Sequence, residues 1–175
     1  MFTFWNFAAY QLAWFAVVIS AARGVAWAGA AVAILLAAAH VAIRRDPLDL
    51  KLIGLAAGIG LLVDGTLALT GQVRFAAAWP EGFAPYWMLS LWMVFATTLN
   101  HSLRWLMTRP VAAALAGALG GPLAYLAGAK LGALTIVTPP LTLPLIALLW
   151  TPAMVAMSMI VLRASTLPAA GRLPA

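Results

Sequence analysis

Apolar residues in this chain fall in nearly continuous runs of about 20 residues, the length an α-helix needs to cross the hydrocarbon core of a bilayer. Of the 175 residues, 65% are hydrophobic and 8% are charged. The mean hydropathy of +1.02 leaves too little polar surface to cover a soluble domain of this size. The sequence therefore predicts an all-α integral membrane protein.

The breaks between the runs predict a polytopic transmembrane bundle of about six spans. We expect the helices near residues 3–22, 25–43, 49–70, 85–106, 110–134 and 142–162. Residues 1–164 are expected to form a single transmembrane domain. The Pro- and Gly-containing segment 165–175 is expected to form a short cytoplasmic tail.

Basic residues predict the orientation of the bundle. The most charged stretch, residues 44–51, should face the cytoplasm by the positive-inside rule. With six spans, Arg23 and Arg74 then fall on the opposite side. The cytoplasmic side holds seven basic residues: Arg44, Arg45, Lys51, Arg104, Arg109, Arg163 and Arg172. Both termini are therefore expected in the cytoplasm.

Composition excludes several classes of function. The chain has no cysteine, two histidines and four acidic residues, so the sequence predicts no metal site and no cofactor. It contains no phosphate loop, nucleophile elbow or zinc helix, which argues against a soluble-type enzyme. The net charge is +6, and the basic residues that cause it flank the apolar spans. This position is typical of contacts with anionic lipid head groups rather than with nucleic acid.

Polar residues inside the predicted spans are costly in lipid and mark candidate functional positions. Thr97, His101 and Arg104 share one face of the predicted helix 85–106, with Asn100 beside them. His40 and Asn6 fall near the same depth, and Gln11 lies closer to the middle. These residues predict a polar chamber open to the cytoplasm, where His101 could exchange a proton near neutral pH. The alternative is that they only form hydrogen bonds between helices.

Asp64 and Lys130 form a second candidate pair in the half of the bundle away from the cytoplasm. Pairing would spare two charges the cost of isolation in lipid, so the sequence predicts an intramembrane ion pair. Alternatively, Lys130 extends to the head groups without meeting Asp64.

Glycines at four-residue spacing predict close helix packing, which small residues permit in lipid. Gly54 and Gly58 form one such pair, Gly117 and Gly121 another, and Gly128 and Gly132 a third. All three faces are expected to be buried, either within one bundle or between copies, and the oligomeric state stays open.

The segments 91–103 and 121–128, with the opening Asn6-Phe7-x-x-Tyr10-Gln11-x-x-Trp14-Phe15, resemble a family of small six-helix bacterial inner-membrane proteins of unknown function. The likeness covers nearly the whole chain. It implies a multi-pass protein of the bacterial cytoplasmic membrane, encoded near cyclopropane-fatty-acyl-phospholipid synthase-like enzymes and flavin-dependent oxidoreductase-like proteins. The family-like polar positions in this chain are Asn6, Gln11, Asp64, Asn100, His101 and Tyr125. On that ground Tyr125 is included among the residues of the predicted polar chamber.

Three functions remain open at this point. The resemblance favours an accessory or binding protein in membrane-lipid (fatty-acyl) modification or handling, with membrane lipids and a lipid-modifying enzyme as partners. A small transporter or substrate-capturing membrane subunit is the first alternative. A membrane-embedded enzyme using His101 is the least favoured, because no second strong acid or base is expected near that residue. Whether the chain is an enzyme therefore stays open, and the sequence favours a role without catalysis.

Overall fold

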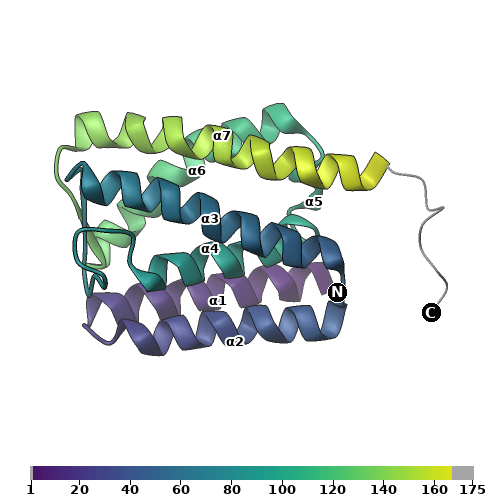
Figure 1. Ribbon diagram of the computed structural model, residues 1–175, viewed down its shortest axis with the longest axis horizontal. Helices are drawn as coiled ribbons and strands as arrows, with labels where there is room; N and C mark the ends of the chain where they lie inside the picture. Colours follow the sequence, from purple (N-terminus) through teal and green to yellow (C-terminus); the bar gives the residue numbers. More distant parts are fainter. Residues whose placement is uncertain (1, 167–175) are drawn as a thin grey trace.

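The structure is a computed structural model that describes residues 2–166, which form helices and one small β-ribbon (Figure 1). The elements are α1 (Phe2–Ala22), α2 (Ala26–Arg44), α3 (Pro47–Leu69), β1 (Val73–Phe75), α4 (Tyr86–Leu99), α5 (Arg104–Met107), α6 (Pro110–Lys130), β2 (Leu134–Ile136) and α7 (Pro139–Thr166). The tail predicted over 165–175 lies outside the described residues, apart from Ser165 and Thr166 at the end of α7.

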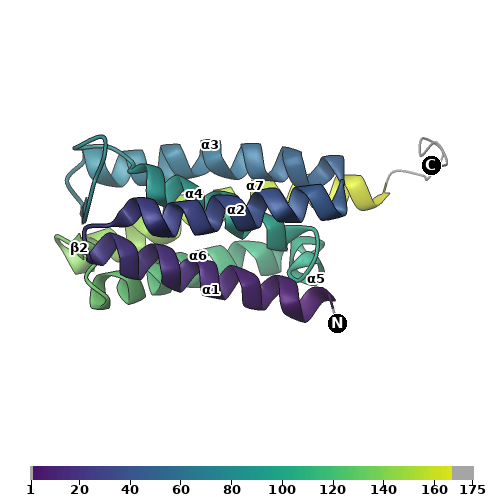
Figure 2. The ribbon, with the colours of Figure 1, turned by 90° about the horizontal axis from the view of Figure 1, so that it is seen from below.

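The six longer helices run side by side along one axis (Figures 1 and 2). One end of the bundle, here called the α2–α3 end, contains the start of α1, the connection from α2 to α3, and the end of α7. The opposite end, the ribbon end, contains β1 and β2. The start of α1 and the end of α7 therefore lie at the same end of the molecule.

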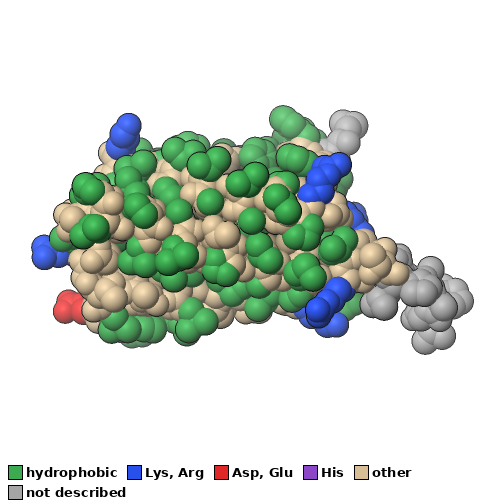
Figure 3. Space-filling view, turned by 90° about the horizontal axis from the view of Figure 1, so that it is seen from above, with side chains coloured by type: hydrophobic (Ala, Val, Ile, Leu, Met, Phe, Trp, Pro, Cys, Tyr) green, Lys and Arg blue, Asp and Glu red, His purple; other side chains and the backbone are tan. Residues whose placement is uncertain are grey.

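Five helices are long and apolar enough to cross a membrane: α1, α2, α3, α6 and α7. Their outer faces carry large apolar side chains, such as Leu12 at 70% and Leu62 at 71% exposure. Figure 3 shows hydrophobic side chains over the flank of the bundle, with basic side chains toward both ends. An exposed apolar belt of this extent is unfavourable in water and is typical of a surface that faces lipid. The protein is therefore a membrane protein.

The predicted fourth span, residues 85–106, is broken in the structure. α4 has 14 residues and ends at Leu99, and a turn leads to the four-residue helix α5. The Leu103 N–H donates to the Thr98 carbonyl across the turn at 2.8 Å. α4 would measure about 21 Å, shorter than the hydrocarbon core. Most of its residues are buried by neighbouring helices, which shield it from lipid.

The fifth predicted span also ends early, because the chain leaves the helix at Lys130 and enters β2. β2 pairs antiparallel with β1, and Arg74 lies opposite Thr135. The ribbon ties the α3–α4 connection to the α6–α7 connection. α7 begins three residues earlier than predicted, at Pro139, since the first turn of a helix tolerates proline.

The glycine prediction is confirmed for Gly117 and Gly121 and wrong for Gly54 and Gly58. It is half right for the third pair, because Gly128 is buried but Gly132 is exposed and lies beyond the end of α6. A Cβ at Gly117 or Gly121 would lie within 3 Å of atoms of α7, so α6 and α7 pack in close contact there. Gly54 and Gly58, by contrast, are exposed and would meet nothing within 4 Å. Two other glycines on α3 are needed for packing: Gly60 lies under the ring of Trp92, and Gly65 lies against the ring of Phe83.

Candidate functional site

The centre of the polar site is Asp49, in the first turn of α3. Asp46 caps that helix, since its Oδ1 accepts a hydrogen bond from the Leu48 N–H at 2.9 Å, and Pro47 follows in the first turn. The short α2–α3 connection therefore places Asp49 one turn above the cap. Its side chain points into the bundle and is fully buried.

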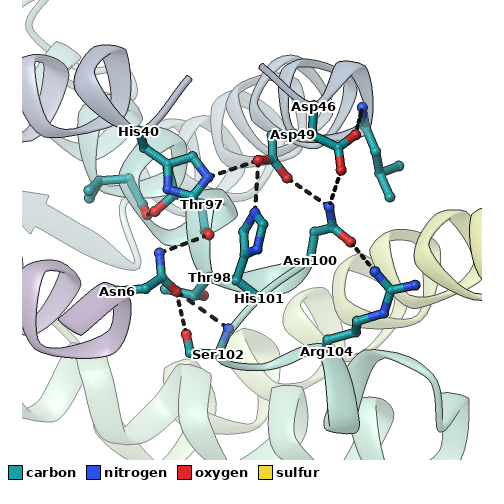
Figure 4. Close-up of polar contacts among 12 residues, drawn as sticks. Asn6, His40, Asp46, Asp49, Thr97, Thr98, Asn100, His101, Ser102 and Arg104 are labelled. Atoms are coloured by element: carbon teal, nitrogen blue, oxygen red, sulfur yellow. Dashed lines mark hydrogen bonds and ion pairs between the residues drawn. The ribbon is translucent and has the colours of Figure 1, made fainter. Parts of the chain in front are cut away.

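Both histidines of the chain converge on Asp49 (Figure 4). Nε2 of His40 on α2 and Nε2 of His101 in the α4–α5 turn each lie 2.8 Å from Asp49 Oδ2. The second carboxylate oxygen, Oδ1, accepts a hydrogen bond from Asn100 Nδ2 at 3.0 Å. Three separate segments of the chain thus meet at one carboxylate. We call Asp49, His40, His101 and Asn100 the Asp49 cluster.

A second layer of polar contacts holds Asn100 in place. Its Nδ2 also donates to Asp46 Oδ2 at 3.1 Å, and its Oδ1 accepts from Arg104 Nη1 at 2.8 Å. Every polar atom of the Asn100 side chain therefore has a partner, and its orientation is fixed.

Asn6 of α1 forms hydrogen bonds with both sides of the turn that follows α4. Its Oδ1 accepts from the Ser102 hydroxyl at 2.6 Å and the Ser102 N–H at 3.4 Å, and its Nδ2 donates to the Thr97 carbonyl at 3.2 Å. The side chain of Asn6 therefore takes the place of a missing helical partner at the turn, as buried backbone groups require in a membrane.

Phe2 covers the two imidazole rings. Its ring centroid lies 6.2 Å from that of His40 and 5.4 Å from that of His101, and the Arg44 guanidinium lies 4.4 Å from the Phe2 ring. The side chains of both histidines keep 8% of their surface exposed. The cluster is therefore shielded at the α2–α3 end without being sealed.

A second buried carboxylate, Asp64, lies further along α3 in the ribbon half. Its Oδ2 accepts from Trp92 Nε1 at 2.8 Å, and its Oδ1 accepts from the Tyr125 hydroxyl. Trp92 stacks on Trp150 of α7 with ring centroids 4.4 Å apart. Asp64 is therefore held by neutral aromatic donors of α4 and α6.

These aromatic side chains form the wall of an apolar groove between α1 and α6. Tyr10 and Trp14 line it from α1, Tyr125 lines it from α6, and Trp92 and Phe95 of α4 form part of its floor. The centre of a water-sized sphere can occupy about 60 Å³ of it. On that measure, the groove has room for a few water-sized groups.

Comparison with known proteins gives one match. Residues 3–156 match the model of a family described as "Protein of unknown function (DUF2878)". The chain belongs to this family. No curated protein and no solved structure matches it. The matched range contains the whole Asp49 cluster, Asp64 and the groove, so both sites lie in the part of the chain that matches the family model.

In this family member, the residues predicted to form one polar chamber divide between two places. Asn100, His101 and Arg104 meet at the Asp49 cluster, and Thr97 lies beside them through its contact with Asn6. Tyr125 instead binds Asp64 in the other half of the bundle. Gln11 is partly buried on α1 and neither lines the groove nor contacts Asp49.

The structure does not bring Asp64 and Lys130 together. Asp64 uses both carboxylate oxygens on Trp92 and Tyr125, while Lys130 is exposed at the end of α6. Two neutral donors replace the expected cation, so Asp64 has no need of Lys130.

The sequence reasoning missed Asp49 and Asp46, which were treated as loop charges. It also expected no second strong acid or base near His101, and this is wrong because Asp49 Oδ2 lies 2.8 Å from His101 Nε2. The ring of His40 lies beside that of His101, with centroids 4.8 Å apart. The sequence did contain a signal, because an Asp followed by a Pro is typical of a helix start. A helix capped by Asp46 places Asp49 in its first turn, where its side chain can face the bundle.

Proposed function

We propose that this protein binds a membrane lipid, with one acyl chain in the groove between α1 and α6, and that it serves membrane-lipid (fatty-acyl) modification or handling as an accessory protein. The observation that carries the proposal is the position of the groove. It is an aromatic, apolar hollow on the flank of two membrane-spanning helices. Acyl chains are the only molecules constantly present at that surface in a bilayer.

The chemistry of the groove supports a lipid rather than a polar solute. Its lining is dominated by aromatic and aliphatic side chains, and aromatic walls pack well against hydrocarbon. Within residues 2–166, Trp150 Nε1 is the buried side-chain polar atom without a hydrogen-bond partner, and Trp150 lines this groove.

The proposal also covers location and partners. We place the protein in the bacterial cytoplasmic membrane with the α2–α3 end in the cytoplasm, where Arg44, Arg45, Lys51 and Arg109 would meet anionic head groups. The groove then lies in the leaflet facing away from the cytoplasm, not at the cytoplasmic side where the polar residues suggested a chamber. A lipid-modifying enzyme is the proposed protein partner.

The test is native mass spectrometry with lipid identification on protein purified in mild detergent. Wild type is expected to retain one lipid per chain, and the mass identifies it as a phospholipid or a free fatty acid. Ala124→Trp places a large ring in the groove and should abolish retention. Leu123→Trp is the matched control, because Leu123 is exposed on the same helix and does not line the groove.

Equal lipid retention by wild type and both variants would refute a specific site and leave only the general lipid shell. Equal loss from both variants would show that the tryptophan disturbs α6 itself. In that case Trp14→Ala, which widens the groove from α1, gives the independent measurement, and unchanged lipid identity and affinity in it would reject the proposal.

A further inference from the structure

Three side chains in the Asp49 cluster direct ligand atoms at one point. One ring nitrogen of His40, one of His101 and a carboxylate oxygen of Asp49 all lie within 4.8 Å of one another. An ion bound at about 2.0–2.2 Å from each atom would hold them about 3.3 Å apart. The two spacings of 2.8 Å from a ring nitrogen to Oδ2 reach that geometry if they lengthen by about 0.5 Å. The two ring nitrogens lie at most 4.8 Å apart, so they must approach each other by up to about 1.5 Å.

The ligand types favour a particular class of ion. Two imidazoles and one carboxylate form the three-ligand set found in catalytic zinc sites and non-haem iron sites. Calcium and magnesium prefer oxygen ligands alone, and soft copper(I) prefers sulfur. The chain has no cysteine. A divalent ion of the zinc and iron(II) class therefore fits these donors best.

The surroundings resemble the outer shell of a metal site. Asn100 fixes the carboxylate through Oδ1 and is itself fixed by Arg104 and Asp46. This leaves Oδ2 directed at the two histidines. Such outer hydrogen bonds orient metal ligands in proteins. Phe2 adds an apolar cover over both rings, and the 8% exposure of the histidine side chains leaves a route for an ion.

We propose that His40, Asp49 and His101 bind one divalent transition-metal ion at the α2–α3 end of the bundle. Three protein ligands leave at least one coordination position for water or another small ligand. The site does not depend on the proposed lipid groove, because it shares none of the residues that line the groove. The alternative is that the same atoms form only a hydrogen-bonded lock between helices, with each histidine donating to Asp49.

Titration with Co²⁺ and Zn²⁺ separates the two readings. The protein is purified in detergent with a histidine-free affinity tag and stripped with a chelator. We expect one Co²⁺ per chain, with visible d–d absorption typical of nitrogen and oxygen ligands, and displacement of that ion by Zn²⁺. Zn²⁺ should also raise the thermal unfolding midpoint of wild type.

Variants then test the assignment of each ligand. His40→Gln and His101→Gln keep a side chain able to hydrogen-bond with Asp49 but remove the imidazole ligand, so each should lose the cobalt spectrum. Asn100→Ala should weaken binding by about 10–100-fold through loss of the outer hydrogen bond. Asp64→Asn is the matched control, as a buried carboxylate of the same helix outside the cluster, and should bind as wild type does.

The proposal is overturned if stripped, folded wild type binds no Co²⁺ or Zn²⁺ stoichiometrically. It is equally overturned if both histidine variants bind with wild-type affinity. If His40→Gln fails to fold, His40→Asn takes its place. Retention of the wild-type cobalt spectrum in His40→Asn would also reject the site.

Discussion

Asp49 and Asp64 are both fully buried carboxylates on α3, about 22 Å apart along the helix axis, and their surroundings are opposite in kind. Asp49 meets two imidazoles and an amide at the end of the bundle, where head groups and water are near. Asp64 meets an indole and a phenol in the ribbon half. The same residue on one helix thus serves a polar junction at one depth and an aromatic, apolar groove at another.

The difference shows how this bundle separates two kinds of stabilisation. At the α2–α3 end, a shared acceptor joins α2, α3 and the α4–α5 turn. In the ribbon half, close packing of glycines against large rings joins α6 to α7 and α3 to α4. Substitutions in the two regions should therefore differ in size and in cause.

The largest effect is expected from Asp49→Ala. Two imidazoles and an amide would lose a buried carboxylate partner, and removing one member of a buried polar group of this kind costs about 3–5 kcal/mol, so the free energy of unfolding should fall by that amount. The measurement is reversible unfolding in detergent with a chelator present, so that a bound ion does not contribute. If Asp64→Ala costs as much as Asp49→Ala, the polar junction has no special role in stability.

Gly121→Val tests the packing of the ribbon half. A Cβ at Gly121 would lie 2.5 Å from Trp150 Cγ, and overpacking of this kind costs about 1–3 kcal/mol. Gly120→Val is the control on the neighbouring residue, where an added Cβ meets nothing within 4 Å. Equal unfolding free energies for the two variants would contradict the close α6–α7 contact.

Asp46→Ala removes the cap of α3 and one of the contacts of Asn100. The expected loss is about 1 kcal/mol, the usual value for an N-cap. Asp46→Asn should recover most of it, because asparagine caps helices about as well as aspartate. Chemical or thermal unfolding of the three proteins gives the comparison, and a large loss in Asp46→Asn would show that the charge itself is required.

The smallest effect is expected from Tyr125→Phe, which removes only the hydroxyl that donates to Asp64. Hydrogen bonds between helices in membranes contribute about 0.6 kcal/mol on average, so the unfolding free energy should fall by about that amount. Tyr10→Phe is the control, since Tyr10 lines the same groove but is not a partner of Asp64. If Tyr125→Phe lowers the free energy of unfolding about as much as Asp49→Ala, the contacts of Asp64 contribute as much to stability as those of Asp49.

The sequence predicted the helices well where apolar runs are long, and less well where tertiary contacts decide. Residues 3–22 and 25–43 were expected as spans and lie within one residue of α1 and α2 at each end. The break after Leu99 could not be predicted, because it depends on Asn6, which accepts hydrogen bonds from Ser102 across 96 residues of chain. Local pattern carries no information about such a partner.

The candidate site was predicted in part for the same reason. Asn100 and His101 stood out as costly residues in an apolar run, and His40 was placed at the same depth. Asp49 looked like an ordinary loop charge, because only the cap at Asp46 turns it inward. Lys130 stood out by charge alone, and its exposed position follows from the helix ending there.

The contacts of Asp49 also imply an order of assembly. His40 and Asp49 lie nine residues apart and can meet as soon as α2 and α3 form a hairpin. His101, Asn100 and Ser102 can join only after α4 has entered the membrane. α4, the shortest of the six longer helices, thus docks its end against polar groups that the earlier helices already hold in position.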